Sequence, residues 1–85
     1  MARYSLVFKQ SVAKDLRVIP AADVRRILDG INALADDPRP PGSEKLSGQS
    51  RYRLRQGVYR ILYSIEAEVL VVTVVKVAHR REAYR

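Results

Sequence analysis

The sequence predicts an α+β protein of two layers, in which a pair of helices packs on one face of a four-stranded sheet. Residues 11–35 carry apolar side chains at helical spacing, whereas the stretches near both ends of the chain are rich in β-branched and aromatic residues. A segment rich in proline and glycine separates the two halves. The expected element order is βααβββ. Because 85 residues leave room for one hydrophobic core, we expect a single domain over residues 1–85.

A strand and two helices are expected in the first half. Residues 3–8 (RYSLVF) favour a strand with Tyr4, Leu6 and Phe8 on one face. Ser11 is a candidate N-cap for a short helix that Pro20 ends. That helix would place these residues on its apolar face: Val12, Leu16 and Ile19.

The second helix, from about Ala21 to Ala35, is the clearest periodic segment. Gly30 lies inside it, where glycine costs about 1 kcal/mol relative to alanine. The polar face is expected to be solvated. The apolar stripe consists of Val24, Ile27, Leu28, Ile31, Leu34 and Ala35.

The second half predicts a loop followed by three strands. Residues 36–50 contain three prolines and two glycines, so a loop is expected there. Residues 69–78 (VLVVTVVKVA) are apolar on both faces, which is typical of a central strand. This strand needs the two helices as cover on one side.

The stretch RYRLRQGVYRILY, residues 51–63, predicts a β-hairpin. If Gln56 and Gly57 form a two-residue loop, Arg53 faces Arg60 and Arg55 faces Val58. Arg51 then joins these three arginines on one face of the sheet. The other face collects apolar and aromatic side chains that can pack on the helices: Tyr52, Leu54, Tyr59, Ile61 and Tyr63.

The arginine face has two possible explanations. Like charges opposite one another on a sheet are destabilising, within a range of roughly 0.2–1 kcal/mol. A bound anion would relieve that repulsion and could accept bidentate guanidinium contacts. Alternatively, the arginines only make an outer face soluble. Both explanations remain open at this point.

Composition and charge narrow the function classes. The net charge is +7, and residues 50–85 hold eight cations and three acids against eight and six in residues 1–49. A basic second half indicates a phosphate, acidic protein or anionic surface as partner. The absence of cysteine excludes disulfides, thiol catalysis and thiolate zinc sites, and one histidine cannot hold a metal alone. We therefore expect neither metal nor cofactor.

The N-terminus (MARYSLVFKQ) lacks the apolar core of a signal peptide, and no apolar run reaches 18 residues. A cytoplasmic protein without a membrane segment is expected.

The last residues, HRREAYR, repeat the composition of the hairpin. His79, Arg80, Arg81, Tyr84 and Arg85 supply cations and a ring directly after the apolar strand. Such residues can neutralise phosphates and stack on an RNA base. The alternative is a polar tail without a role.

With these features the sequence resembles the RelE branch of the RelE/ParE toxins of type II toxin–antitoxin systems. The resemblance rests on the element order, on KLSG (Lys45 to Gly48), on the hairpin YRLRQGVYRILY and on the ending VAHRREAYR. It covers nearly the whole chain. The family's fold implies an antiparallel sheet with the strand order 1-4-3-2. Its activity implies cleavage of messenger RNA in the ribosomal A site.

The resemblance also implies which residues are catalytic: Arg53, Arg55, Arg60, Arg80 and Tyr84. Arg53 and Arg55 match two basic positions before the hairpin turn, and Arg60 matches the arginine after it. Arg80 and Tyr84 match an arginine and a tyrosine near the C-terminus. Lys45, Arg51, Arg81 and Arg85 are expected to add RNA contacts.

Arginine is a poor proton acceptor, because its pKa exceeds about 12. The general base is therefore sought elsewhere. His79 is the obvious candidate, because its unperturbed pKa lies near neutrality, and Glu82 is the next.

The implied partners are a RelB-like antitoxin, in a heterocomplex, and the ribosome with its message. Two other classes remain: a ParE-like inhibitor of DNA gyrase, and a basic domain that binds RNA or a protein partner without catalysis.

Overall fold

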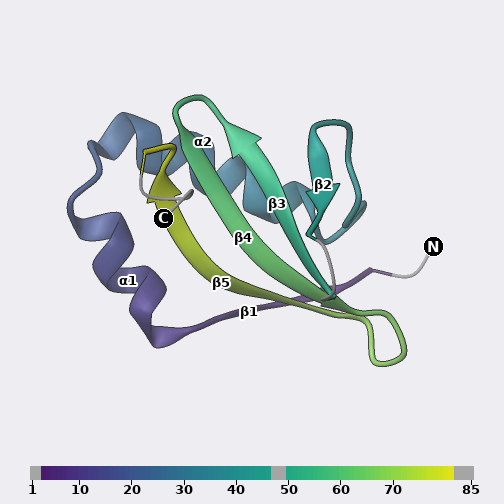
Figure 1. Ribbon diagram of the computed structural model, residues 1–85. Helices are drawn as coiled ribbons and strands as arrows, with labels where there is room; N and C mark the ends of the chain where they lie inside the picture. Colours follow the sequence, from purple (N-terminus) through teal and green to yellow (C-terminus); the bar gives the residue numbers. More distant parts are fainter. Residues whose placement is uncertain (1–2, 47–49, 82–85) are drawn as a thin grey trace.

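The computed structural model describes residues 3–46 and 50–81. Two helices and five strands are assigned within these residues (Figure 1). In chain order they are β1 (Ser5–Phe8), α1 (Gln10–Arg17), α2 (Ala21–Ala33), β2 (Ser43–Lys45), β3 (Arg51–Gln56), β4 (Tyr59–Glu66) and β5 (Val71–His79). Neither helix combines the length and the apolar character needed to cross a membrane.

The strands form one mixed sheet with the order β1-β5-β4-β3-β2. The α+β class is confirmed, but the expectation of four antiparallel strands is wrong in two respects. First, β1 runs parallel to β5, with Ser5 aligned with Val71. Two helices lie between β1 and the rest of the sheet in the chain, which provides the long connection that a parallel pair requires.

Second, the expected loop over residues 36–50 contains a short edge strand. β2 pairs antiparallel with β3, with Glu44 opposite Arg53. Three residues of ordinary polar character carry no recognisable strand pattern, so the pairing with β3 decides their conformation. The predicted order of the other four strands is confirmed, with β5 between β1 and β4.

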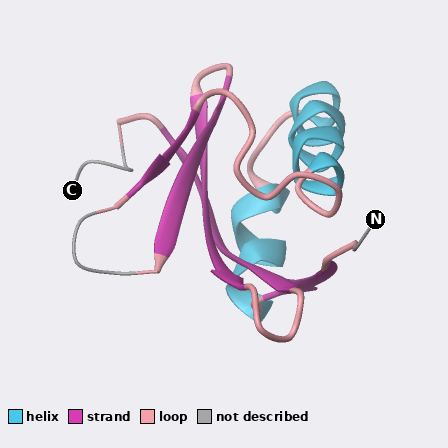
Figure 2. Cartoon of the chain, turned by 90° about the vertical axis from the view of Figure 1, so that its right-hand side faces the viewer, coloured by secondary structure: helices cyan, strands magenta, loops and turns pink. Residues whose placement is uncertain are grey.

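The helices cover one face of the sheet and leave the opposite face without a helix (Figure 2). The core lies between the two layers and joins α1 and α2 to β3, β4 and β5. The predicted apolar faces of the helices and of the hairpin supply much of it. Its most buried members include Val12, Ile27, Ile31, Leu34, Ile61, Tyr63, Val72 and Val74.

The helix ends differ from the expected ones. α1 begins after Lys9, which occupies the N-cap position without a side-chain hydrogen bond, so Ser11 is not the cap. α1 ends at Arg17, and Pro20 is the N-cap residue of α2. A proline suits this boundary because it donates no backbone hydrogen bond.

The predicted register of the β3–β4 hairpin is also wrong. Gln56 pairs with Tyr59, so the two loop residues are Gly57 and Val58. Gly57 has a φ of 61°, a conformation that glycine adopts without steric cost. Arg55 therefore faces Arg60, whereas Arg53 faces Leu62.

Moving the loop by one residue changes each cross-strand partner by two positions. Because side chains alternate with a period of two, every side chain keeps its predicted face. The tyrosine and aliphatic positions remain in the core, and the arginines remain on the opposite face.

Two stacked tyrosines hold the segment that leads into β2. The rings of Tyr52 and Tyr63 lie 5.7 Å apart, and the Tyr63 hydroxyl donates a 2.7 Å hydrogen bond to the Pro38 carbonyl. Burial raises the pKa of Tyr63, which keeps the hydroxyl protonated as a donor. Arg39 Nε donates to the Tyr52 hydroxyl at 3.1 Å. These contacts position the start of the edge strand.

Replacing Gly30 by alanine is expected to raise the free energy of unfolding by up to about 1 kcal/mol. The added Cβ would lie 2.9 Å from Gln56 Oε1, the far end of a flexible side chain that can move aside. Urea denaturation measures the change. Gly42→Ala is the control of opposite sign, because Gly42 has a φ of 92°. A clear loss of stability in Gly30→Ala would show that Gln56 is fixed in place.

Candidate RNA-binding and catalytic site

The sheet face that no helix covers carries the hairpin arginines. Arg51, Arg53 and Arg55 alternate along β3, and Arg60 on β4 lies directly opposite Arg55. We call this set, Arg51, Arg53, Arg55 and Arg60, the arginine face. The pleat of the two strands alone brings these cations together.

Arg60 is the buried member of the arginine face. Only 7% of the residue is exposed. Its Nη1 donates to the carbonyl oxygens of Tyr59 at 2.9 Å and Gly57 at 3.2 Å. Its Nε is buried without a hydrogen-bond partner among the described residues. The hairpin backbone thus orients one side of the guanidinium and holds its charge at the end of the sheet.

An acidic residue, Glu44, lies on the arginine face. Arg53 Nη2 donates to Glu44 Oε2 at 2.6 Å, across the β2–β3 pair. The hydrogen bond and charge of Arg53, with smaller contributions from Arg55 and Arg60, hold the pKa of Glu44 below its ordinary value of 4.5. The carboxylate therefore stays ionised at neutral pH and senses three of the arginines.

The sequence does not indicate Glu44 as a site residue, because the proline-rich segment around it predicts a loop. A strand of three residues is too short for its alternation to be recognised in the sequence. Lys76 was also missed: it lies opposite Leu62, on the same side of the sheet as Arg53. Its Nζ is 3.5 Å from Asp15 Oδ1 of α1.

Arg80 extends the arginine face beyond the end of β5. Its backbone N–H donates to the Val58 carbonyl at 2.7 Å, which continues the β4–β5 register to the hairpin loop. By alternation, Arg80 is on the side of Ala78 and Arg60. Its side chain is exposed. The structure thus brings Arg80 to the end of the sheet where Arg55 and Arg60 lie.

His79 lies on the other side of the sheet. It pairs with Tyr59, whose ring packs edge-on to the imidazole at a centroid distance of 5.9 Å. His79 Nδ1 accepts the Arg81 backbone N–H at 3.2 Å. The imidazole borders a hollow of about 280 Å³ that Asp15 and Val18 of the α1 region help to line. His79 therefore does not converge with the arginine face.

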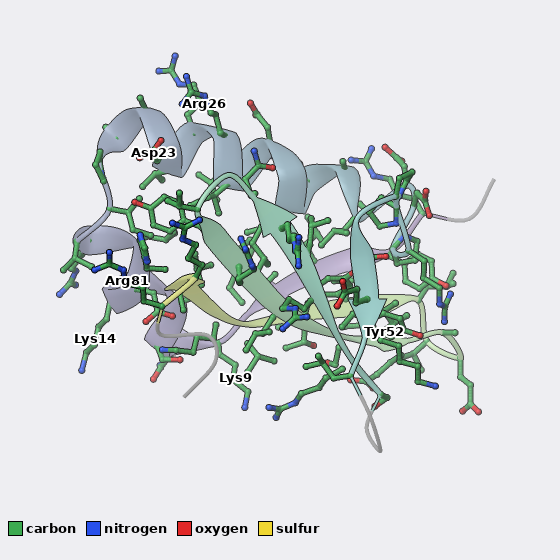
Figure 3. All side chains as sticks on the ribbon, turned by 45° about the horizontal axis from the view of Figure 1, so that its top comes forward. Lys9, Lys14, Asp23, Arg26, Tyr52 and Arg81 are labelled. Atoms are coloured by element: carbon green, nitrogen blue, oxygen red, sulfur yellow. The ribbon has the colours of Figure 1, made fainter. Side chains whose placement is uncertain are left out.

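The other predicted site residues lie away from the arginine face or outside the described residues. Lys45 pairs with Tyr52, so it is on the side of the sheet opposite to Arg53. Arg81 is exposed and lies at the end of the molecule where α1 is found, away from Tyr52 (Figure 3). Tyr84 and Arg85 lie outside the described residues.

Within residues 3–46 and 50–81, no three His, Asp or Glu side chains come together as a metal site. The donors of the arginine face suit an anion rather than a cation.

Comparison with known proteins assigns the family. The family described as the ParE toxin of type II toxin–antitoxin systems (parDE) matches residues 6–84. The chain is a toxin of the RelE/ParE superfamily. Toxin RelG of Mycobacterium tuberculosis is 28% identical over 86 residues, which cover 96% of this chain and 97% of RelG.

Solved structures assign this RelE/ParE toxin to the RelE branch. The archaeal RelE–RelB complex from Pyrococcus horikoshii OT3 contains a chain that is 31% identical, with a TM-score of 0.83 and coverage of 94% of this chain and 97% of that one. The RelBE2 complex of Mycobacterium tuberculosis gives 25% identity, a TM-score of 0.80 and coverage of 92% and 99%.

Arg53→Ala is expected to raise the pKa of Glu44 towards 4.5, because Arg53 is the largest cause of its depression. Carboxyl-carbon NMR during an acid titration measures this pKa directly. Arg51→Ala is the matched control, since Arg51 pairs with Ser64 and does not contribute to the shift. If the Glu44 pKa stays unchanged in Arg53→Ala, the ion pair does not form in solution.

Proposed function

We propose that this toxin is an endoribonuclease that cleaves messenger RNA in the A site of the ribosome and so inhibits translation. The observation that carries the proposal is the convergence of Arg53, Arg55 and Arg60 on the uncovered sheet face, with Arg80 at its end. The membership of the chain in the RelE branch supports it. The proposed place of action is the cytoplasm.

The chemistry needs no metal. The 2′-oxygen attacks the adjacent phosphorus, the bond from phosphorus to the 5′-oxygen breaks, and the products are a 2′,3′-cyclic phosphate and a 5′-hydroxyl. The 2′-hydroxyl loses a proton and the leaving 5′-oxygen gains one. Negative charge grows on the phosphoryl oxygens during the attack. Guanidinium groups aimed at these oxygens lower the barrier.

The arginines have distinct proposed roles. Arg60 is held by the hairpin carbonyls, so it presents a fixed charge to the phosphate. Arg80 is exposed and can close on the phosphate from the end of the sheet. Arg53 and Arg55 bind neighbouring backbone phosphates. The predicted role of Tyr84 is stacking on a base or orienting the 2′-oxygen.

Among the described residues, the arginine face has no group suited to proton transfer, and Glu82, the second candidate base, lies outside these residues. His79 is on the other side of the sheet and its Nδ1 is occupied by a backbone N–H. We therefore leave His79 out of the proposed proton transfer. Alignment of the message by the ribosome can supply a large part of the rate, since holding reactants in place is worth about 7–11 kcal/mol in favourable cases.

Arg60→Ala and Arg80→Ala are each expected to reduce cleavage about 10²–10³-fold, the effect of removing one electrostatic donor. Mapping message ends in cells that produce each variant measures this. Arg25→Ala is the matched control, because it removes the same charge from an exposed position on α2. Thermal melting verifies that Arg60→Ala still folds. Full cleavage by both variants would contradict the proposal.

Cleavage of free RNA is expected to be much slower than cleavage of ribosome-bound message, because the arginines suit phosphate binding and none of the described residues beside them suits a general base. Rates measured on one message with and without ribosomes test this. Equal rates would show that the chain supplies the complete catalytic apparatus.

The family description also names ParE toxins, so gyrase inhibition is the second candidate. A supercoiling assay with purified gyrase separates the two, because inhibition without RNA cleavage identifies a ParE-like activity. RNA binding without cleavage and without growth arrest would instead identify a binding domain.

We further propose that a RelB-like antitoxin neutralises this toxin in a heterocomplex, as the RelE–RelB complex of Pyrococcus horikoshii suggests by its composition. The net charge of +7 favours an acidic partner. Co-production with the protein from an adjacent acidic reading frame should restore growth and give a stable complex.

A further inference from the structure

The arginine face carries its own anion. The Glu44 carboxylate accepts a hydrogen bond from Arg53 at 2.6 Å, and the two side chains are 53% and 17% exposed, respectively. A carboxylate presents two oxygens to the guanidinium fork, as a phosphate does. Glu44 therefore occupies, at Arg53, the type of position that a backbone phosphate would take in an RNA complex.

Hydrogen bonds fix the backbone on both sides of Glu44. On one side of Glu44, the Ser43 backbone N–H and hydroxyl both donate to the Pro40 carbonyl, at 3.0 and 2.8 Å. On the other side, the Leu46 N–H donates to the Arg51 carbonyl at 2.8 Å. The β2–β3 register then sets Glu44 directly opposite Arg53. The backbone thus places the two side chains within reach of each other on the same side of the sheet.

A role as general base fits Glu44 less well. A base is most effective when its pKa lies near the working pH, whereas the surrounding arginines favour the ionised form of Glu44. The oxygen that accepts from Arg53 must also exchange that bond before it can accept a proton. Competition with phosphate requires only that Arg53 exchange Glu44 for a phosphate oxygen, while the carboxylate stays ionised.

We propose that Glu44 competes with RNA phosphate for Arg53 and thereby sets the RNA affinity of the arginine face. Binding of RNA replaces the Arg53–Glu44 contact and leaves a carboxylate beside the phosphate, which weakens the complex. Free RNA is disfavoured, whereas a message presented at high effective concentration by the ribosome can displace Glu44. This inference rests on RNA as the ligand of the proposed function.

Glu44→Gln removes the charge while keeping the shape of the side chain. We expect it to bind a 2′-O-methyl RNA oligonucleotide at least about fivefold more tightly than the parent, as measured by fluorescence anisotropy. The slope of log affinity against log KCl should steepen by up to about 0.7, the contribution of one neutralised phosphate on a single strand, because Glu44 no longer offsets the charge of Arg53.

Glu68→Gln is the matched control, because Glu68 is exposed in the β4–β5 turn and its loss changes the net charge equally. Its affinity should stay within twofold of the parent. Glu44→Thr provides a second neutral variant with a side chain that suits an edge strand. Thermal melting of all three establishes that they fold.

The outcomes decide the inference separately from the proposed function. If Glu44→Gln binds no more tightly than Glu68→Gln, or if neither binds RNA, competition by Glu44 is overturned. Weaker binding overturns it too, because Glu44 would then be orienting Arg53. So does a 100-fold loss of ribosomal cleavage with unchanged RNA affinity, which would make Glu44 a general base. Tighter binding by Glu44→Gln without cleavage by the parent supports the inference and refutes the ribonuclease.

Discussion

The turn at Gly57 and Val58 sets the register of β3 against β4, and the two faces of the sheet depend on that register. With these loop residues, the side of Tyr52 and Tyr63 points to the helices and the side of Arg53 and Arg60 points away. A loop longer or shorter by one residue would exchange the faces of one strand, and would bury arginines against apolar helices. The core and the candidate site are therefore two consequences of one hairpin.

Concentrating cations on one face costs free energy, and the structure offsets that cost locally. Arg55 and Arg60 lie directly opposite each other, an arrangement that repels. Carbonyl oxygens of the hairpin loop accept hydrogen bonds from Arg60, and Glu44 accepts one from Arg53. A protein that only needed solubility could scatter these charges. Their grouping on one face fits the phosphate-binding role that we propose, and Glu44 is the anion that they hold when no RNA is bound.

Residues that are neighbours in the chain lie on opposite sides of the sheet and have different surroundings. His79 and Arg80 are adjacent, yet one borders the hollow near α1 and the other continues the edge of the arginine face. The same alternation separates Lys45 from Glu44. The pleat thus separates residues that are neighbours in the C-terminal motif, and His79 is not positioned for the proton transfer of the proposed reaction.

The sequence by itself determined the α+β class, the two amphipathic helices, the central position of β5 and the division of the hairpin into an arginine side and a tyrosine side. These follow from side-chain periodicity, which is local and survives a shift of the turn by one residue. Tertiary structure alone decided three other features. β1 is parallel to β5, and the two helices belong to the long connection that a parallel pair requires. β2 exists because β3 offers an edge for pairing, and that pairing places Glu44 on Arg53. The side occupied by His79 depends on the register of β5 against β4, which contacts between distant residues establish.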